Sequence, residues 1–314
     1  MDSRRIESVQ LIRAIASILI MLNHWAFIWE KQTNWNLSLF HMGSFRVPMF
    51  FFISGFIIHY IFFQKKQTIL KFLKARFFKI YSLYYIFFIP ALIMWFYKPE
   101  LFNAATGHQT DILASFFLIP AKEGYMHIIN VTWTLPYILW FYVIFGVFKK
   151  FAKDNDDLLI FASLYILSIT IFHSFLFSPL FIYFFWGLIF SISLSERNKQ
   201  IFTIAVVTFI IYLYLLNIIG SSNIINILIA VFLPITIIML ELKEKIRIPK
   251  FLSKIGDASF EIYLSHNLIF GAEIIIYKLI GIDNLIYNII YALSMLISII
   301  IFSIYFHKFS KRFI

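Results

Sequence analysis

The sequence has no cysteine, little charge and few of the residues that break helices. Of its 314 residues 14% are charged, 10 are glycine and 8 are proline, whereas 61% are hydrophobic. The absence of cysteine excludes a disulfide framework, a thiolate metal site and a cysteine nucleophile. Soluble domains carry about 25% charged residues, so the low charge excludes a water-soluble globule, and the high apolar content excludes a disordered chain. The composition therefore predicts a protein whose solvent is largely lipid.

Long apolar runs recur along the whole chain. A helix needs about 20 mostly apolar residues to cross a bilayer. We therefore predict an all-α polytopic helix bundle, a single integral membrane domain over 1–314 with both termini cytoplasmic. No cleavage site follows the first apolar run, so we expect it to remain as the first span rather than a signal peptide. The ten predicted spans are 11–29, 46–63, 80–97, 132–148, 158–173, 179–194, 201–219, 222–240, 258–277 and 284–306.

The connection between the third and fourth predicted spans, residues 98–131, is the longest in the chain. It contains a shorter apolar stretch at 112–120. That stretch is too short to cross a bilayer. We predict a re-entrant or interfacial piece there.

The positive charge of the chain has a simple explanation in a membrane protein. The 27 Lys and Arg residues exceed the 16 Asp and Glu residues, giving a net charge of +11. Cytoplasmic loops of membrane proteins are rich in Lys and Arg. With a cytoplasmic N-terminus, 22 cations fall on the cytoplasmic side, and the other five are Lys31, Arg46, Lys98, Lys122 and Lys278. This bias favours the predicted orientation and removes nucleic acid as the expected partner.

Ionisable side chains inside spans are costly, so each is a functional candidate. Arg13 and His24 lie eleven residues apart, which on an α-helix leaves an offset of only about 20° and a rise of about 16 Å. A cation at the cytoplasmic mouth and a base past mid-membrane would outline a pore for an anionic molecule. Taken singly, His24 also fits a buried structural histidine, and Arg13 an interface anchor. The other candidates are His59, Glu261 and His266, with Arg46 and Arg76 at span ends.

Two short patterns have both a packing and a binding interpretation. Ser54 and Gly55 lie in the segment FFFISGF at 50–56, where small residues allow close approach of a helix or a ligand. Arg76 and Lys79 share one helix face and form either a phosphate clamp or ordinary cytoplasmic charge.

The last candidate segment is GDASFEIYLSH at 256–266. Tyr263 and His266 are three residues apart and can face one interior cavity, and Glu261 is expected to pair with a basic group. A structural hydrogen-bond network explains these residues equally well.

Two further candidates have a structural interpretation. Trp133 fits the aromatic belt of a membrane interface, and His59 fits an interfacial histidine whose hydrogen bonds are satisfied.

Taken in order, these pieces resemble the membrane acyltransferase 3 family, integral membrane enzymes that acylate sugars and related hydroxyl compounds. The resemblance covers nearly the whole chain. It is carried by Arg13 and His24 as R-x10-H, by FFFISGF at 50–56, by RFFK at 76–79 and by 256–266. Two positions depart from the family pattern. Ile138 replaces the acidic residue of the family's W-S-L-x-x-E segment, and Lys79 replaces an arginine. We expect no hydrolase-like domain of the kind that some members carry.

The resemblance implies an activity and its substrates. The expected co-substrate is acyl-CoA, most often acetyl-CoA, with no bound cofactor and no metal. The acceptor is expected to be a hydroxyl of a cell-surface glycan, such as a lipopolysaccharide or exopolysaccharide, or of its lipid-linked precursor. The expected location is a bacterial cytoplasmic membrane, in contact with membrane lipid.

The resemblance, read together with the residue pattern, also implies roles for single residues. His24 would act as general base or form an acyl-imidazole, with Tyr263 and His266 of second rank. The donor side would comprise Arg13, Arg76, Lys79, Ser54 and Gly55, and the acceptor side Arg46 and Trp133.

Two other functions fit a chain of this composition. A transporter or flippase for a lipid-linked saccharide would also use ten spans with buried charge. Such transporters carry interrupted helices in corresponding places of two similar halves, and no such repeat is evident in this sequence. A non-catalytic scaffold would make the alignment of Arg13 and His24 a coincidence.

Overall fold

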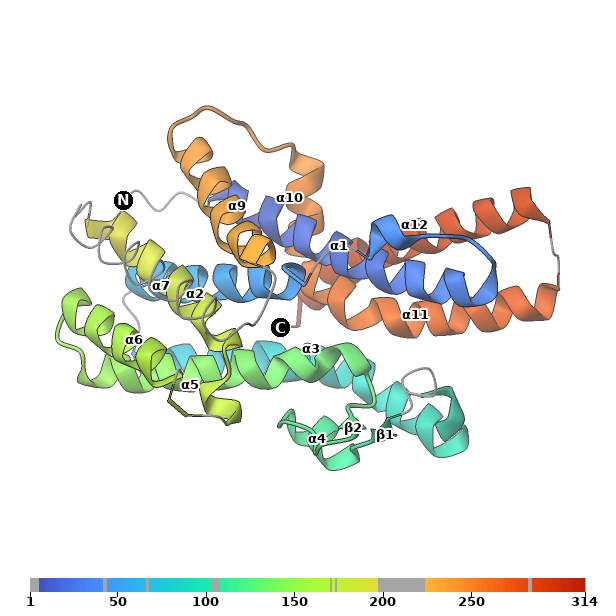
Figure 1. The fold of residues 1–314 in the computed structure, drawn as a ribbon, viewed down its shortest axis with the longest axis horizontal. Helices are drawn as coiled ribbons and strands as arrows, with labels where there is room; N and C mark the ends of the chain where they lie inside the picture. The colour runs from blue at the N-terminus through green and yellow to red at the C-terminus, as the bar shows by residue number, and fades with distance from the viewer. Residues whose placement is uncertain are drawn as a thin grey trace. The chain divides into compact units, whose positions relative to one another are not determined.

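The computed structural model describes residues 6–41, 44–65, 68–102, 108–169, 171–172, 174–196, 224–281 and 284–313. Helices dominate these residues (Figure 1). The chain divides into two compact units. Unit 1 comprises 1–12, 43–77 and 137–248, and unit 2 comprises 13–42, 78–136 and 249–314.

Long helices account for most of the described chain, and short elements fill the connections. The α-helices are α1 (Glu7–Gln32), α2 (Arg46–Lys65), α3 (Ile69–Tyr97), α4 (Ile112–Phe117), α5 (Leu135–Phe151), α6 (Asn155–Ile169), α7 (Leu180–Glu196), α9 (Ile224–Leu242), α10 (Lys250–Asp257), α11 (Ser259–Ile280) and α12 (Leu285–Ser310). The short elements are η1 (Ser38–Phe40), η2 (Pro99–Leu101), η3 (Asn130–Thr134), η4 (Phe175–Phe177) and the paired strands β1 (Gln109–Thr110) and β2 (Tyr125–Met126).

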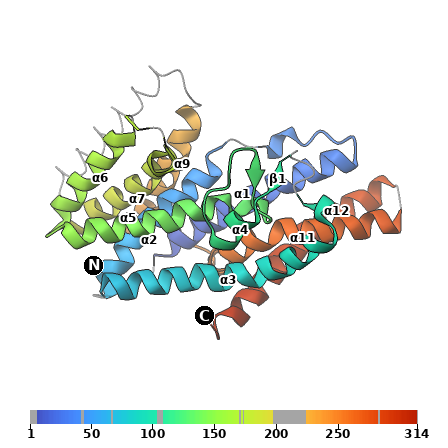
Figure 2. The same cartoon turned by 90° about the horizontal axis from the view of Figure 1, so that it is seen from below.

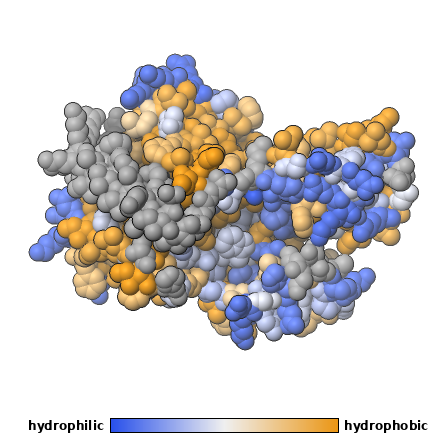
Figure 3. Space-filling model, in the orientation of Figure 1, coloured by the Kyte–Doolittle hydropathy of each residue, from blue (hydrophilic) through white to orange (hydrophobic). Residues whose placement is uncertain are grey.

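Every predicted span except 201–219 overlaps one of these helices, although the predicted span 158–173 runs past the end of α6 at Ile169, and 201–219 lies outside the described residues. Five helices of the described part, α1, α3, η3 with α5, α9 and α12, are long and apolar enough to cross a membrane. Large apolar side chains are exposed on the described residues, including Leu293, Ile297 and Ile301 of α12. Apolar patches are visible on the face that Figure 3 shows. The protein therefore has the helices of a membrane protein. The number of ten spans and the side of each terminus remain predictions.

Helix α3 begins earlier than the sequence pattern predicted. The predicted span starts at residue 80, whereas the helix starts at Ile69. The intervening residues carry the charges that ended the apolar window, yet Lys and Arg are good helix formers. As a result Arg76 and Lys79 both lie within α3, as their predicted shared helix face requires.

In unit 1, α2 and α7 pack with their backbones in close contact. A Cβ on Gly55 would lie 1.9 Å from the carbonyl oxygen of Phe184, and a Cβ on Gly187 would lie 1.9 Å from that of Phe52. Only glycine fits at such a crossing. The rings of Phe51 and Phe184 stack at 4.4 Å beside it. The small residues of 50–56 are thus explained locally by helix packing.

Unit 2 gathers the C-terminal hairpin of α11 and α12 with α1 from Arg13 onward (Figure 1). The indole Nε1 of Trp25 donates to the carbonyl of Ala292 on α12 at 2.8 Å. The core between these helices includes Met21, Trp29, Phe270 and Met295. These contacts bring the C-terminal half of α1 against both α11 and α12.

The described part of the connection at 98–131 folds as a small layer against α3 in unit 2 (Figure 2). Asp111 caps α4 by accepting from the N–H of Ala114 at 2.9 Å. The hydroxyls of Tyr81, Tyr84 and Tyr85 donate to the carbonyls of Phe117, Ser115 and Phe116 at the end of α4. The predicted piece at 112–120 therefore contains a six-residue helix anchored by tyrosines.

Candidate active site at two histidines

The two histidines ranked for chemistry come together in unit 2. His24 of α1 and His266 of α11 have ring centroids 5.2 Å apart, with planes tilted by 45°. His24 is half-buried, and His266 has no exposed surface. The two residues are 242 positions apart in the sequence, so the pair exists only because α1 packs on α11. Two adjacent imidazoles, one of them fully buried, can take up and release a proton during a reaction.

Hydrogen bonding assigns the protonation of His266. Its Nδ1 lies 2.9 Å from the carbonyl oxygen of Ile262. A carbonyl only accepts, so Nδ1 carries the hydrogen, and in a neutral ring Nε2 presents a lone pair. Nε2 is buried and has no partner among the described residues. Leaving a buried polar atom unpaired costs about 1–3 kcal/mol, a cost that a binding or catalytic role explains.

Tyr263 stands one turn before His266, with ring centroids 6.3 Å apart. Its hydroxyl donates to the carbonyl of Val131 and lies 2.6 Å from the hydroxyl of Thr134. Both partners belong to the η3–α5 segment. The phenol therefore fastens η3 onto α11, directly beside the histidine pair. Its predicted role in the chemistry remains a prediction.

Arg13 lies on α1, which runs without interruption from Glu7 to Gln32. The eleven-residue spacing between Arg13 and His24 is therefore helical throughout, as the same-face argument requires. The rise between them is about 16 Å on an α-helix. Arg13 is half-buried.

The remaining donor-side candidates lie on α3 and α2. The guanidinium of Arg76 lies 5.2 Å above the ring of Phe72, and Lys79 is exposed one turn further along. The hydroxyl of Ser54 donates to the carbonyl of Phe50 at 2.8 Å within its own helix. Gly55 is accounted for by the backbone of α7. A donor-binding role of these residues remains a prediction.

The two acceptor-side candidates lie on different elements. Arg46 is the first residue of α2, and its Nη1 is buried without a partner in the described part of the chain. Trp133 lies in η3 and is 42% exposed. In the described residues no three His, Asp or Glu side chains are grouped as metal ligands.

The structure also identifies polar residues that the sequence pattern missed. Glu261 finds the basic partner predicted for it in His307 of α12, at 2.6 Å. His307 lies one residue beyond the predicted span 284–306, so its depth was not evident. Glu273 faces α12 and accepts from Ser298 at 2.7 Å. It lies seven residues after His266, about 20° from it around the helix, and that spacing was the signal that could have found it.

The comparison with protein families identifies the chain. A family model described as an acyltransferase domain, that of the acyltransferase 3 family, matches residues 6–308. Neither the search of curated proteins nor the search of solved structures finds a match. The matched range includes both histidines, Arg13 and the α3 cations.

Proposed function

Because the chain belongs to the acyltransferase 3 family, we propose that it transfers an acyl group, most simply acetyl, from acyl-CoA to a sugar hydroxyl. The donor is cytoplasmic, and the acceptor is a cell-surface glycan or its lipid-linked precursor. The observation that supports this most is the ring contact between His24 and His266, since acyl transfer to a hydroxyl needs a base beside the acceptor oxygen.

The chemistry requires the net transfer of one proton from the acceptor hydroxyl to the CoA sulfur and one exchange of bonds at the acyl carbon. In direct transfer, an imidazole takes the hydroxyl proton while the acceptor oxygen bonds to the acyl carbon. The carbon–sulfur bond then breaks, and the proton passes to the CoA thiolate. In the covalent route, a ring nitrogen of His24 first attacks the acyl carbon, the carbon–sulfur bond breaks, and the proton that the imidazolium loses passes to the CoA thiolate. The acceptor hydroxyl then attacks the acyl carbon, and its proton returns to the departing imidazole. In either route, His266 is the imidazole that lies beside His24.

The proposed binding of CoA is supported by the charge of the candidate residues and by the length of the CoA arm. CoA carries its phosphates at one end and the thioester at the end of a long arm. Arg13, Arg76 and Lys79 supply cations for the phosphates. The rise of about 16 Å from Arg13 to His24 along α1 suits the arm between phosphate and thioester.

The proposal is tested with membranes that contain the protein, radiolabelled acetyl-CoA and a cell-envelope glycan extract. The wild type should label the glycan, and His24→Ala should reduce the rate by about 10²-fold or more. His108→Ala, a histidine on the exposed connection, should label normally. Insertion and folding are checked for each variant by detergent extraction and size-exclusion chromatography.

Two outcomes would contradict the proposal. Labelling that persists in folded His24→Ala would show that this histidine is not part of the chemistry. Purified protein that neither binds CoA nor labels the glycan, but moves a lipid-linked saccharide between leaflets of a vesicle, would make the chain a flippase.

A further inference from the structure

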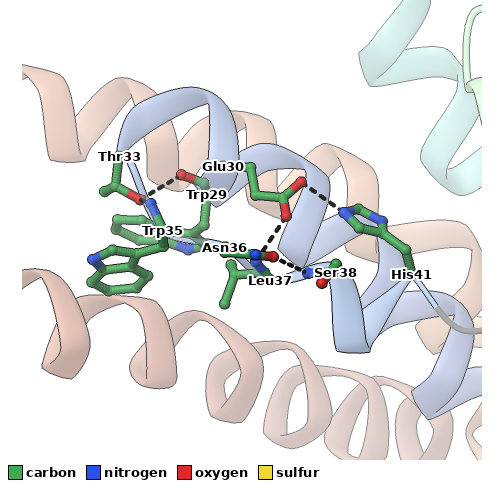
Figure 4. A network of polar contacts seen from close by, with 8 residues as sticks. All are labelled: Trp29, Glu30, Thr33, Trp35, Asn36, Leu37, Ser38 and His41. Carbon is green, nitrogen blue, oxygen red and sulfur yellow. Dashed lines mark hydrogen bonds and ion pairs between the residues drawn. The ribbon is translucent and has the colours of Figure 1, made fainter.

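A second polar cluster lies in unit 2 beyond the histidine pair, at the C-terminal end of α1. Figure 4 shows how the loop after α1 is held. Glu30 accepts from the backbone N–H of Leu37 at 2.8 Å and contacts Nε2 of His41 at 2.6 Å. Thr33 donates to the carbonyl of Trp29 at 2.8 Å and accepts from the N–H of Trp35 at 3.3 Å. The loop is therefore fixed by side-chain contacts from its own helix.

These contacts hold Trp35 in a stack on Trp29. The two indoles lie 5.6 Å apart with planes at 19° (Figure 4). Trp29 in turn contacts Tyr277 of α11 at 5.1 Å and Tyr291 of α12 at 6.4 Å. Tyr277 stacks on Tyr287 at 6.0 Å. We call Trp29, Trp35, Tyr277, Tyr287 and Tyr291 the aromatic cluster, and it joins α11, α12 and the end of α1.

Three polar atoms at the aromatic cluster are buried without a partner in the described part of the chain. They are Nε1 of Trp29, the hydroxyl of Tyr287 and Oε2 of Glu273. Glu273 belongs to the same region, because its backbone carbonyl accepts from the hydroxyl of Tyr291 at 2.8 Å. Unpaired buried groups are rare in native proteins, and each requires an explanation. A donor and a hydroxyl thus belong to the aromatic cluster itself, and an acceptor belongs to a residue bonded to it.

The loop itself offers amides and hydroxyls but no Lys or Arg. Asn34, Asn36 and Ser38 are exposed around the partly exposed Trp35. The sequence has no Lys or Arg from 32 to 45. A site for a phosphate would use Arg or Lys. Aromatic faces with amide, hydroxyl and carboxylate groups suit a neutral polyhydroxyl ring, which has apolar faces and polar edges.

We propose that the aromatic cluster and the loop 33–41 form a subsite for a sugar ring of the acceptor. The inference rests on the proposed function, because it presumes a glycan acceptor. Trp29 follows His24 by five residues on α1, a rise of about 7.5 Å, and Trp35 lies beyond it. The subsite therefore holds a sugar next to the one that reacts at the histidine pair. The charge bias predicts this end of α1 to be extracytoplasmic, where such a glycan would arrive.

The test compares two acceptors of identical composition. One is an oligosaccharide fraction of the cell envelope, and the other is the same fraction hydrolysed to monosaccharides. Trp35→Ala should raise the apparent KM for the oligosaccharides about tenfold and leave the KM for acetyl-CoA and the rate with monosaccharides unchanged. Trp35→Phe, which keeps an aromatic face, should restore most of the affinity. Trp95→Ala, on α3 of the same unit, is the matched control and should change neither acceptor.

The outcomes separate this inference from the proposed function. If Trp35→Ala impairs acetylation of both acceptors equally, or of neither, Trp35 is a membrane-interface anchor and the proposed subsite is wrong. If the wild type acetylates nothing, the proposed function fails, and quenching of tryptophan fluorescence by the oligosaccharides then decides the subsite alone. Quenching lost in Trp35→Ala but kept in Trp95→Ala supports it, and its absence in the wild type overturns it.

Discussion

Two buried histidines, one in each unit, have opposite surroundings. His59 of unit 1 is 1% exposed, with Nδ1 2.8 Å from the hydroxyl of Ser191 and Nε2 3.4 Å from the side-chain oxygen of Asn155. His266 of unit 2 is completely buried, and only its Nδ1 is bonded, to the carbonyl of Ile262. Its Nε2 has no partner in the described residues. The two side chains are therefore equally buried, and they differ in whether the second ring nitrogen has a hydrogen-bond partner.

The difference predicts that His59 is structural and that His266 takes part in the reaction. A buried polar group with all its hydrogen-bond partners stabilises a fold. A buried lone pair without a partner lowers the stability, so its presence requires an explanation such as a functional role. In unit 1, His59 links α2, α7 and the start of α6. In unit 2, His266 lies against a second imidazole.

The largest expected effect contrasts these two residues directly. His266→Gln should lower the rate of acetyl transfer by about 10²-fold or more, because it removes the imidazole lone pair beside His24. His59→Gln should leave the rate per folded molecule nearly unchanged but lower the Tm, since it disturbs hydrogen bonds worth about 1–3 kcal/mol. Rates and Tm values of detergent-purified variants measure both. Equal losses of rate in the two variants would show that His266 and His59 do not differ in their roles.

The next contrast concerns two glycines. Gly55→Ala should destabilise unit 1 by ~3 kcal/mol or more, because the new methyl would meet the Phe184 carbonyl on a backbone that cannot move aside. Gly271→Ala on α11 has open space around its Cβ and should stabilise the helix by up to about 1 kcal/mol. Thermal unfolding in detergent compares the pair. A well-folded Gly55→Ala variant with impaired CoA binding would favour the donor-binding role instead.

The third prediction tests the cations of α3. Replacing Arg76 and Lys79 together by Gln should raise the apparent KM for acetyl-CoA about tenfold, the equivalent of 1.4 kcal/mol of lost phosphate contact. Lys71 and Lys74 replaced by Gln form the matched control, because they remove the same charge at the same spacing on the same helix. Equal shifts in both double variants would indicate a general field of positive charge. A shift in the acceptor KM alone would contradict the phosphate clamp.

The smallest expected effect concerns Tyr263. Tyr263→Phe removes the contacts to Val131 and Thr134 and should cost about 1 kcal/mol of stability with little change in rate. Thr134→Val should have a similar effect, and the double variant should lose less than the sum. A rate loss of about 10²-fold in Tyr263→Phe would instead support an oxyanion-stabilising role.

Helix positions could be predicted from the sequence more reliably than helix ends. Apolar runs mark where helices lie, and each predicted span in the described part contains one. The start of α3 was missed because a hydropathy window ends at charge, whereas a helix continues through Lys and Arg. The predicted partner of Glu261 was confirmed as His307, although only the packing of α11 on α12 identified it.

The sequence by itself determined the lipid-soluble character of the chain, the family and the spacing of Arg13 and His24, because composition, motif and helical periodicity are local properties. The tertiary structure decided which residues meet. It placed His266 against His24 and brought the hydroxyl of Tyr263 into contact with that of Thr134. It also brought together the aromatic cluster from α11, α12 and the loop end of α1. Helix packing sets such contacts, and a single sequence carries no local signal for which faces of distant helices will touch.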